Sequence, residues 1–284
     1  MVGAPPSVVL TIAGFDPSSG AGVTADIKTI AAHGCYGVAC ITALTVQSTM
    51  GVQRVSTVAC DIISETLAEL DSDVEIAAVH IGMLGSARVA QAVADFLISA
   101  KLPNIVLDPV LTSSSGAELL DKSGLQILTG TLLPLSTVIT PNLEEAAVLT
   151  GLAVTNLDQM RGAATKLHQL GAAGVVVTGG HLEKAVDLLS FTSASGVQQE
   201  VFKAERQQSN STHGTGCAFA TAIACHLAQG KGLPDAVLLA KAYVRAAIMN
   251  AHPLGRGVGP VHHHYRMQQA RRGSSAEPAQ RDKD

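Results

Sequence analysis

The sequence predicts an α/β protein with a mainly parallel central sheet, and three observations support this class. Short β-branched apolar runs alternate with segments of helical periodicity from residue 7 to residue 250. Polar or Gly-rich sequences follow the strand runs, as expected where parallel strands bring their carboxyl ends to one rim. Hydrophobic residues make up 47% of the 284 residues but aromatic ones only 3%, without Trp. The core is therefore expected to consist of Ala, Val, Leu and Ile.

The amino-terminal half begins with residues 7–13 (SVVLTIA), an apolar β-branched run that predicts a buried strand. Residues 14–22 (GFDPSSGAG) form a loop by composition. Residues 23–33 place Val23 and Ile27 on one face of a helix. The segments that follow are an apolar run at 37–46, a helix at 61–70, a strand at 77–81, a helix at about 86–100 and a strand at 104–107.

The carboxyl-terminal half continues the alternation. Strands are predicted at 137–139 and 174–177, and helices at 143–149 and 158–170. Alternating segments at 185–191 and 196–202 indicate antiparallel strands. Helices at about 216–229 and 234–250 complete one domain over residues 1–266. Residues 267–284 lack large apolar side chains after Met267 and are expected to form a disordered tail.

Composition and charge exclude several classes. The net charge of −4 and the absence of a dense basic run argue against a nucleic-acid partner. Five cysteines without a CxxC pair argue against a disulfide framework or structural zinc. No leader-like segment and no run of the roughly 18 apolar residues that span a bilayer is visible, so we expect a cytoplasmic protein without membrane association.

Residues 211–217 (STHGTGC) precede a segment with helical periodicity and predict an anion site. Gly214 and Gly216 let the backbone turn so that several N–H groups converge, and the helix start adds free N–H groups and partial positive charge. The segment is not a Walker A loop, because no Gly-Lys-Ser/Thr follows. A plain Gly-rich turn capped by Thr215 is the alternative.

Cys217 follows the turn and would lie in the first turn of this helix. A helix N-terminus lowers a thiol pKa towards neutrality, which suits a general base. A buried structural cysteine is the alternative for this position.

With these motifs in view, the sequence resembles the hydroxymethylpyrimidine/phosphomethylpyrimidine kinases of thiamine biosynthesis, which belong to the ribokinase-like superfamily. The matches run in order from about residue 8 to residue 264, and together they are specific. They include LTIAG with DPS and GAG at 10–22, ITAL with Gln47, IGML at 81–84, LDPV at 107–110, ITPN with Glu145, GGHL at 179–182, THGTGC at 212–217 and GVGPVHH at 257–263. The resemblance implies a three-layer αβα sandwich.

The resemblance also implies a substrate pocket for an aminopyrimidine, 4-amino-5-hydroxymethyl-2-methylpyrimidine. Asp26 and Gln47 would meet its amine and ring nitrogens with matched donors and acceptors, while Met83 and Val110 would cover the ring face and Gly14 would line the pocket. Core packing is the alternative for Met83, and a solvated helix face is the alternative for Asp26.

For ATP and Mg²⁺, the resemblance implies a second group of residues. Asn142 and Glu145 match an N-x-x-E pattern, with Glu145 acting on the metal through water and Asp108 as the other metal carboxylate. Helix capping by Asn142 and a turn at Asp108-Pro109 are the alternatives. Nucleotide phosphates would be contacted by Thr178, Thr212 and the backbone of Gly214 and Gly216, with Gly214, Thr215, Gly216 and Cys217 forming the catalytic segment.

The implied reaction is in-line attack of the substrate oxygen on the γ-phosphorus of ATP, performed first on the alcohol and then on the monophosphate. Three positions depart from the family pattern: Ser114, where the family often has Lys or Thr, Thr178, where it often has Lys, and Ala117, where it often has Asp. Thr at the second of these positions also occurs in vitamin B6 kinases, so a pyridoxal or pyridoxine kinase is the nearest alternative. A non-catalytic nucleotide-binding protein on the same fold is another. Members of the family usually form homodimers, so the resemblance implies a homodimer.

Overall fold

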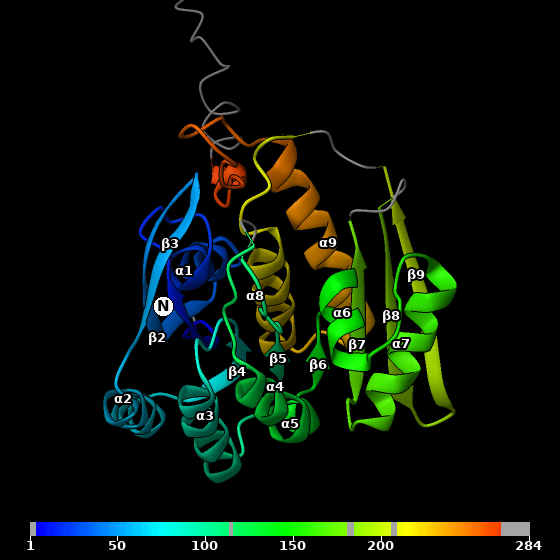
Figure 1. Cartoon of the computed structure of the whole chain (residues 1–284), viewed down its shortest axis with the longest axis horizontal. Coiled ribbons are helices and arrows are strands. Elements are labelled where there is room, and N and C mark those ends of the chain that lie inside the picture. The colour runs from blue at the N-terminus through cyan, green and yellow to red at the C-terminus, as the bar shows by residue number, and fades with distance from the viewer. Residues whose placement is uncertain (1–3, 114–115, 181–184, 206–208, 268–284) are drawn as a thin grey trace, which may run out of the picture.

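The computed structural model describes residues 4–113, 116–180, 185–205 and 209–267, and its central feature is a nine-stranded sheet (Figure 1). The strand order is β3-β2-β1-β4-β5-β6-β7-β8-β9. Strands β1, β2, β4, β5, β6 and β7 run parallel, whereas β3, β8 and β9 pair antiparallel with their neighbours. The strands are β1 (Val8–Phe15), β2 (Tyr36–Ser48), β3 (Gly51–Thr57), β4 (Ile76–Ile81), β5 (Ile105–Leu107), β6 (Val138–Ile139), β7 (Gly174–Gly179), β8 (Ala185–Ser193) and β9 (Gly196–Ala204).

Helices cover both faces of the sheet. One apolar cluster joins the sheet to α2, α3, α4, α6 and α7, and a second joins its other face to α1, α8 and α9. The predicted three-layer αβα arrangement with a mainly parallel sheet is therefore confirmed. The helices are α1 (Gly22–Ala32), α2 (Cys60–Asp73), α3 (Ala87–Ala100), α4 (Lys122–Ile127), α5 (Leu133–Leu135), α6 (Leu143–Thr150), α7 (Leu157–Gln169), α8 (Thr215–Ala228) and α9 (Leu233–Met249), with a π-helical turn at Leu128–Leu132 between α4 and α5.

Helix α8 is the most deeply buried helix near the rim. Ten consecutive residues from Ala218 to Leu227 are buried, and five of them are alanine or cysteine. Small side chains let the helix pack closely against the sheet and α9. Its N-terminus is consequently held in one place relative to the ends of β1 and β5.

The structure differs from the sequence prediction in two regions. The apolar run at 37–46 continues to Ser48 and turns back as β3, which the sequence analysis did not predict. Most of β3 is polar and exposed, so it lacks the apolar pattern that marked the other strands. The segment from α4 to α5 was also not assigned; its helices are three to six residues long.

Two further predictions concern parts that the structure does not describe or test. Of the predicted tail, residues 268–284 lie outside the described residues, as does Ser114. Among the described residues, no helix combines the length and apolarity needed to cross a bilayer.

Candidate functional site

The glycine turn that is predicted to form the anion cradle lies at the start of α8 and is called the cradle below. Gly214 caps the helix with a left-handed φ of 77°, and its carbonyl accepts the Ala218 N–H at 2.9 Å. A Cβ on Gly214 would lie 1.9 Å from the carbonyl oxygen of Gly20, so this position requires glycine. Amides at a helix start lack partners inside the helix and can face an anion, although the Thr215 N–H is also donated to the Thr212 carbonyl at 3.3 Å. The tight contact with Gly20 joins the cradle to the loop after β1.

A buried polar cluster lies beneath the cradle. Asp26, on α1, has no exposed surface, which excludes the solvated-face alternative. Its carboxylate accepts hydrogen bonds from Thr11 at 2.7 Å and Thr221 at 2.9 Å, and it lies 3.3 Å from Nδ1 of His80. Burial lowers the pKa of His80, but the charge of Asp26 outweighs burial and the net pKa is raised. Asp26 is thus fully buried, and both of its carboxylate oxygens already accept hydrogen bonds from protein side chains.

Cys217 lies in the first turn of α8, as expected, but the prediction that the helix N-terminus lowers its thiol pKa is wrong. Burial raises the pKa of Cys217 well above its usual range, and the negative charges of Asp108 and Asp26 raise it further. The partial charge at a helix end is about half an elementary charge, whereas two carboxylates bring two full charges. The thiol is therefore protonated in the unliganded protein at neutral pH.

The two predicted metal carboxylates are both buried, and they are close enough to influence each other electrostatically. Burial raises the pKa of Asp108 to about 6, and burial together with the charge of Asp108 raises the pKa of Glu145 to about 8. Asp108 is 5% exposed and Glu145 7% exposed. Such a pair favours either a shared proton or a cation that neutralises both charges. Oxygen ligands in this number suit Mg²⁺, which retains several waters.

These carboxylates do not form a complete coordination sphere. Within the described ranges no group of three or more His, Cys, Asp or Glu side chains is placed to hold a metal ion. Glu145 also has a structural role, because Asn142 and Glu145 form a capping box at the start of α6: each side chain accepts the backbone N–H of the other at 2.9 Å. The capping alternative for Asn142 is thus confirmed, and it positions Glu145 next to Asp108.

The predicted nucleotide-contact residues lie at the ends of neighbouring elements. Asn142 bridges to Thr178 where β6 and β7 end, and Thr178 donates its N–H to the Pro141 carbonyl at 2.9 Å. Thr212 is exposed and accepts the Thr215 N–H at 3.3 Å within the turn of the cradle. Gly216 lies over Asp108: a Cβ on Gly216 would be 3.7 Å from Asp108 Oδ2. The cradle and the acidic pair therefore form one continuous site.

The predicted substrate residues Gly14, Met83 and Val110 also come together. A Cβ on Gly14 would lie 2.9 Å from the sulfur of Met83, and Met83 packs with Val110 in a small apolar cluster around Ala43. Met83 is thus part of the apolar packing, which was the alternative for this residue. It lies at the edge of the cluster that is nearest to Gly14. Gln47 lies near the end of β2, with its side chain 3.3 Å from His213 Nε2.

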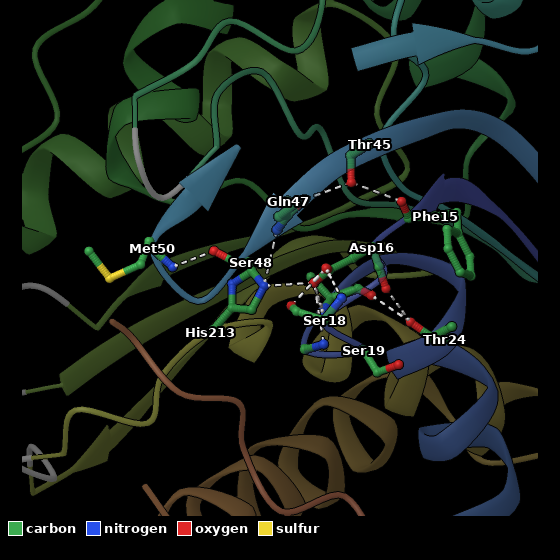
Figure 2. A network of polar contacts seen from close by, with 12 residues as sticks. Phe15, Asp16, Ser18, Ser19, Thr24, Thr45, Gln47, Ser48, Met50 and His213 are labelled. Carbon is green, nitrogen blue, oxygen red and sulfur yellow. Dashed lines mark hydrogen bonds and ion pairs between the residues drawn. The ribbon is translucent and has the colours of Figure 1, made fainter. Parts of the chain in front are cut away.

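Asp16 and His213 lie in sequence motifs that do not reveal a function for either residue, and the structure places both in one polar network (Figure 2). Asp16 Oδ2 lies 2.8 Å from His213 Nε2, and its Oδ1 accepts the backbone N–H and the hydroxyl of Ser18. Burial raises the pKa of Asp16, but hydrogen bonds from His213, Ser18 and Ala21 outweigh burial and lower it overall. The signal available in the sequence was an Asp followed by Ser and Gly, a common pattern for a carboxylate that accepts loop amides.

Comparison with known proteins agrees with this geometry. A family model described as phosphomethylpyrimidine kinase matches residues 16–262. A hydroxymethylpyrimidine/phosphomethylpyrimidine kinase of Streptomyces coelicolor is 41% identical over 91% of this chain and 94% of that protein. A thiamine biosynthesis bifunctional protein of Geobacter sulfurreducens is 43% identical over 91% of this chain but 52% of that protein, so the chain spans about half of that relative.

Solved structures are similar throughout the fold. An ADP complex of Bacillus subtilis pyridoxal kinase superposes with a TM-score of 0.83 at 36% identity, covering 92% of this chain and 99% of that one. A phosphomethylpyrimidine kinase of Clostridium difficile superposes with a TM-score of 0.76 at 36% identity, covering 85% and 99%. The match of the family model over most of the length, together with the ordered motifs, shows that this chain belongs to the phosphomethylpyrimidine kinase family.

Proposed function

We propose that this protein transfers the γ-phosphoryl group of ATP to 4-amino-5-hydroxymethyl-2-methylpyrimidine, and then to the resulting monophosphate, in the biosynthesis of thiamine diphosphate. One observation carries the proposal: His213, adjacent to the Gly214 cradle, contacts Gln47, so the anion site and the predicted ring-binding residues are joined in one site. Family membership supports the choice of reaction.

The cradle amides at the start of α8 bind the phosphate groups of ATP and stabilise the charge of the transferring phosphoryl group. Asp108 and Glu145 are the residues that would hold Mg²⁺, Glu145 through water. When bound, the ion neutralises phosphate charge. Because burial raises the pKa values of both carboxyl groups, the pair would share a proton when no cation is bound.

The thiol of Cys217 first releases its own proton to solvent, and the resulting thiolate then accepts the proton of the substrate hydroxyl. Because burial and the charges of Asp108 and Asp26 raise its pKa, the thiol can become a base only after those charges are neutralised in the complete complex. The first acceptor is an alcohol and needs a base, whereas the second is a phosphate that is already ionised. Cys217 therefore contributes mainly to the first phosphorylation.

The experiment that tests the proposal is a coupled assay of purified protein with ATP, Mg²⁺ and either the pyrimidine alcohol or its monophosphate. We expect both acceptors to be phosphorylated, with the diphosphate as the final product by ³¹P NMR. Absence of ATP consumption with either acceptor refutes the proposal and favours a non-catalytic nucleotide-binding protein.

A pyridoxal kinase is the second candidate, favoured by Thr178 and by the similarity to the Bacillus subtilis enzyme. Pyridoxal in the same assay separates the two: a higher kcat/KM for pyridoxal than for the pyrimidine alcohol overturns the substrate assignment while leaving the reaction type intact.

We further propose a cytoplasmic homodimer. Support for self-association comes from Leu44, Val46 and Met50, large apolar side chains that are 52%, 50% and 63% exposed along β2 and the turn after it. Light scattering after size-exclusion chromatography tests the oligomeric state, and cell fractionation tests the location.

A further inference from the structure

The loop after β1 and the loop before α8 are connected by a chain of polar side chains: Thr45, Gln47, His213 and Asp16 (Figure 2). The Thr45 hydroxyl lies 3.0 Å from the Phe15 carbonyl oxygen and 3.1 Å from the Gln47 side-chain oxygen position. The other end of the Gln47 amide lies 3.3 Å from His213 Nε2, which lies 2.8 Å from Asp16 Oδ2. Each contact is within hydrogen-bond distance, so the positions of the hydrogens decide what each group does.

The contact between His213 and Asp16 determines the first hydrogen. Asp16 is an acceptor, because its pKa is lowered and its carboxylate already accepts the N–H groups of Ser18 and Ala21. A contact of 2.8 Å to that carboxylate requires a hydrogen on His213 Nε2. A protonated ring nitrogen has no lone pair, so it cannot also accept an N–H from Gln47. The group of Gln47 that faces His213 is therefore the amide oxygen, which shares the Nε2 hydrogen.

The Thr45 hydroxyl gives the same answer independently. A hydroxyl has one hydrogen, and here that hydrogen is donated to the Phe15 carbonyl at 3.0 Å. Thr45 can then only accept from Gln47, so the amide nitrogen faces Thr45. The oxygen and nitrogen ends of a glutamine amide have nearly the same shape, and hydrogen counting is what distinguishes them.

The network is held rigidly. The backbone N–H of His213 donates to the Gly259 carbonyl at 3.0 Å. The imidazole ring packs on Gly20, where a Cβ would lie 2.2 Å from a ring carbon. The side chains of His213 and Asp16 are only 11% and 4% exposed. The imidazole is thus fixed on its backbone side and at Nε2, and it has little room to move away from Gln47.

We propose that Asp16, His213 and Thr45 form a positioning set that fixes the Gln47 amide with its oxygen towards His213 and one N–H towards Thr45. In this orientation the remaining N–H of the amide is presented as a donor to the substrate. Resting on the proposed function, this inference assigns Gln47 the recognition of a ring nitrogen that accepts a hydrogen bond.

The kinetic test is a double-mutant cycle on Thr45 and Gln47. Thr45→Val removes the acceptor for the amide, whereas Thr45→Ser keeps it and serves as the matched control. We expect Thr45→Val to raise KM for the pyrimidine alcohol ~10-fold, with kcat and KM for ATP unchanged, and Thr45→Ser to restore wild-type KM. In a Gln47→Ala background, Thr45→Val should have no further effect on KM, because residues that act through one contact are not additive.

The outcomes separate this inference from the proposed function. If Gln47→Ala leaves KM for the pyrimidine unchanged, the role of Gln47 in the proposed function fails. If Gln47→Ala raises KM but Thr45→Val behaves like Thr45→Ser, or if the two effects are additive, the positioning set is overturned and the proposed function stands.

A second measurement needs no substrate. In ¹⁵N-histidine NMR of the free protein, the Nε2 signal of His213, assigned by its loss in the His213→Gln variant, should have the chemical shift of a protonated ring nitrogen. An unprotonated Nε2 would overturn the proposed orientation of the amide.

Discussion

Replacement of Gly214 by alanine tests the cradle most directly. The added Cβ would lie 1.9 Å from the carbonyl oxygen of Gly20, and contacts under 3.0 Å are essentially never seen for real Cβ atoms. The two backbone segments must therefore separate by roughly 1 Å. A misplacement of about 1 Å in a catalytic site costs about 100-fold in rate. We expect Gly214→Ala to lower kcat ~100-fold for both acceptors, because the cradle stabilises the transferring phosphoryl group in both steps.

A side chain at Gly214 would also destabilise the fold because the backbone there is left-handed. Gly34→Ala is the control that measures this backbone effect without the steric contact. Gly34 has φ of 73°, close to the 77° of Gly214, but a Cβ there meets no atom within 4 Å. A side chain in this conformation costs about 1–2 kcal/mol. We expect Gly34→Ala to lower the thermal midpoint by a few degrees and to leave kcat unchanged. Wild-type kcat in Gly214→Ala, or an equal loss in Gly34→Ala, would refute the reasoning.

Three further predictions follow from the acidic site and the buried histidines. Cys217→Ala should lower kcat for the alcohol at least ~10-fold more than for the monophosphate; equal losses in a two-acceptor assay count against the base assignment. Glu145→Gln should raise the Mg²⁺ concentration for half-maximal activity without lowering the unfolding midpoint, since glutamine also serves in a capping box. Its control is the exposed neighbour Glu144→Gln, and equal effects of the two variants would contradict the metal role. Burial lowers the pKa of His33 from 6.5 to about 4, so the folded state favours the neutral ring. The contribution of His33 to the free energy of unfolding is therefore complete above pH 6.5 and is lost as the pH falls towards 4. This contribution is at most about 3 kcal/mol. Urea unfolding between pH 4 and 7 should show that the free energy of unfolding falls less steeply with decreasing pH in His33→Gln than in the wild type. The same pH dependence in both proteins would be the contrary result.

Much of the fold follows from local sequence. The strands of the parallel core and the long helices were predicted because apolar periodicity is a property of neighbouring residues. The segments that were not predicted are those whose pattern is weak: β3 is a polar edge strand, and the helices between residues 122 and 135 are short. Such segments are stabilised by pairing with a neighbour, which a local pattern does not reveal.

In the candidate site, too, the features carried by a local motif were predicted and those that depend on distant residues were not. The cradle was predicted because glycines before a helix are visible as a motif, and Gly214 does cap α8 in a left-handed conformation. The pKa of Cys217 was predicted in the wrong direction, because burial raises it and the charges of Asp108 and Asp26, which are distant in sequence, raise it further. Electrostatic effects depend on which charges are close in space.

The sequence by itself determined the class of fold, the position of the cradle and the family. All three depend on residue types at short spacing or in a fixed order along the chain. Only the tertiary structure decided that Asp26 is buried against His80 and Thr221, and that Asp16 bonds to His213, 197 residues away. Those contacts depend on how β1, α1 and α8 pack against one another. Packing brings together groups that have no relation in the sequence, and these contacts hold the cradle against the predicted ring-binding residues.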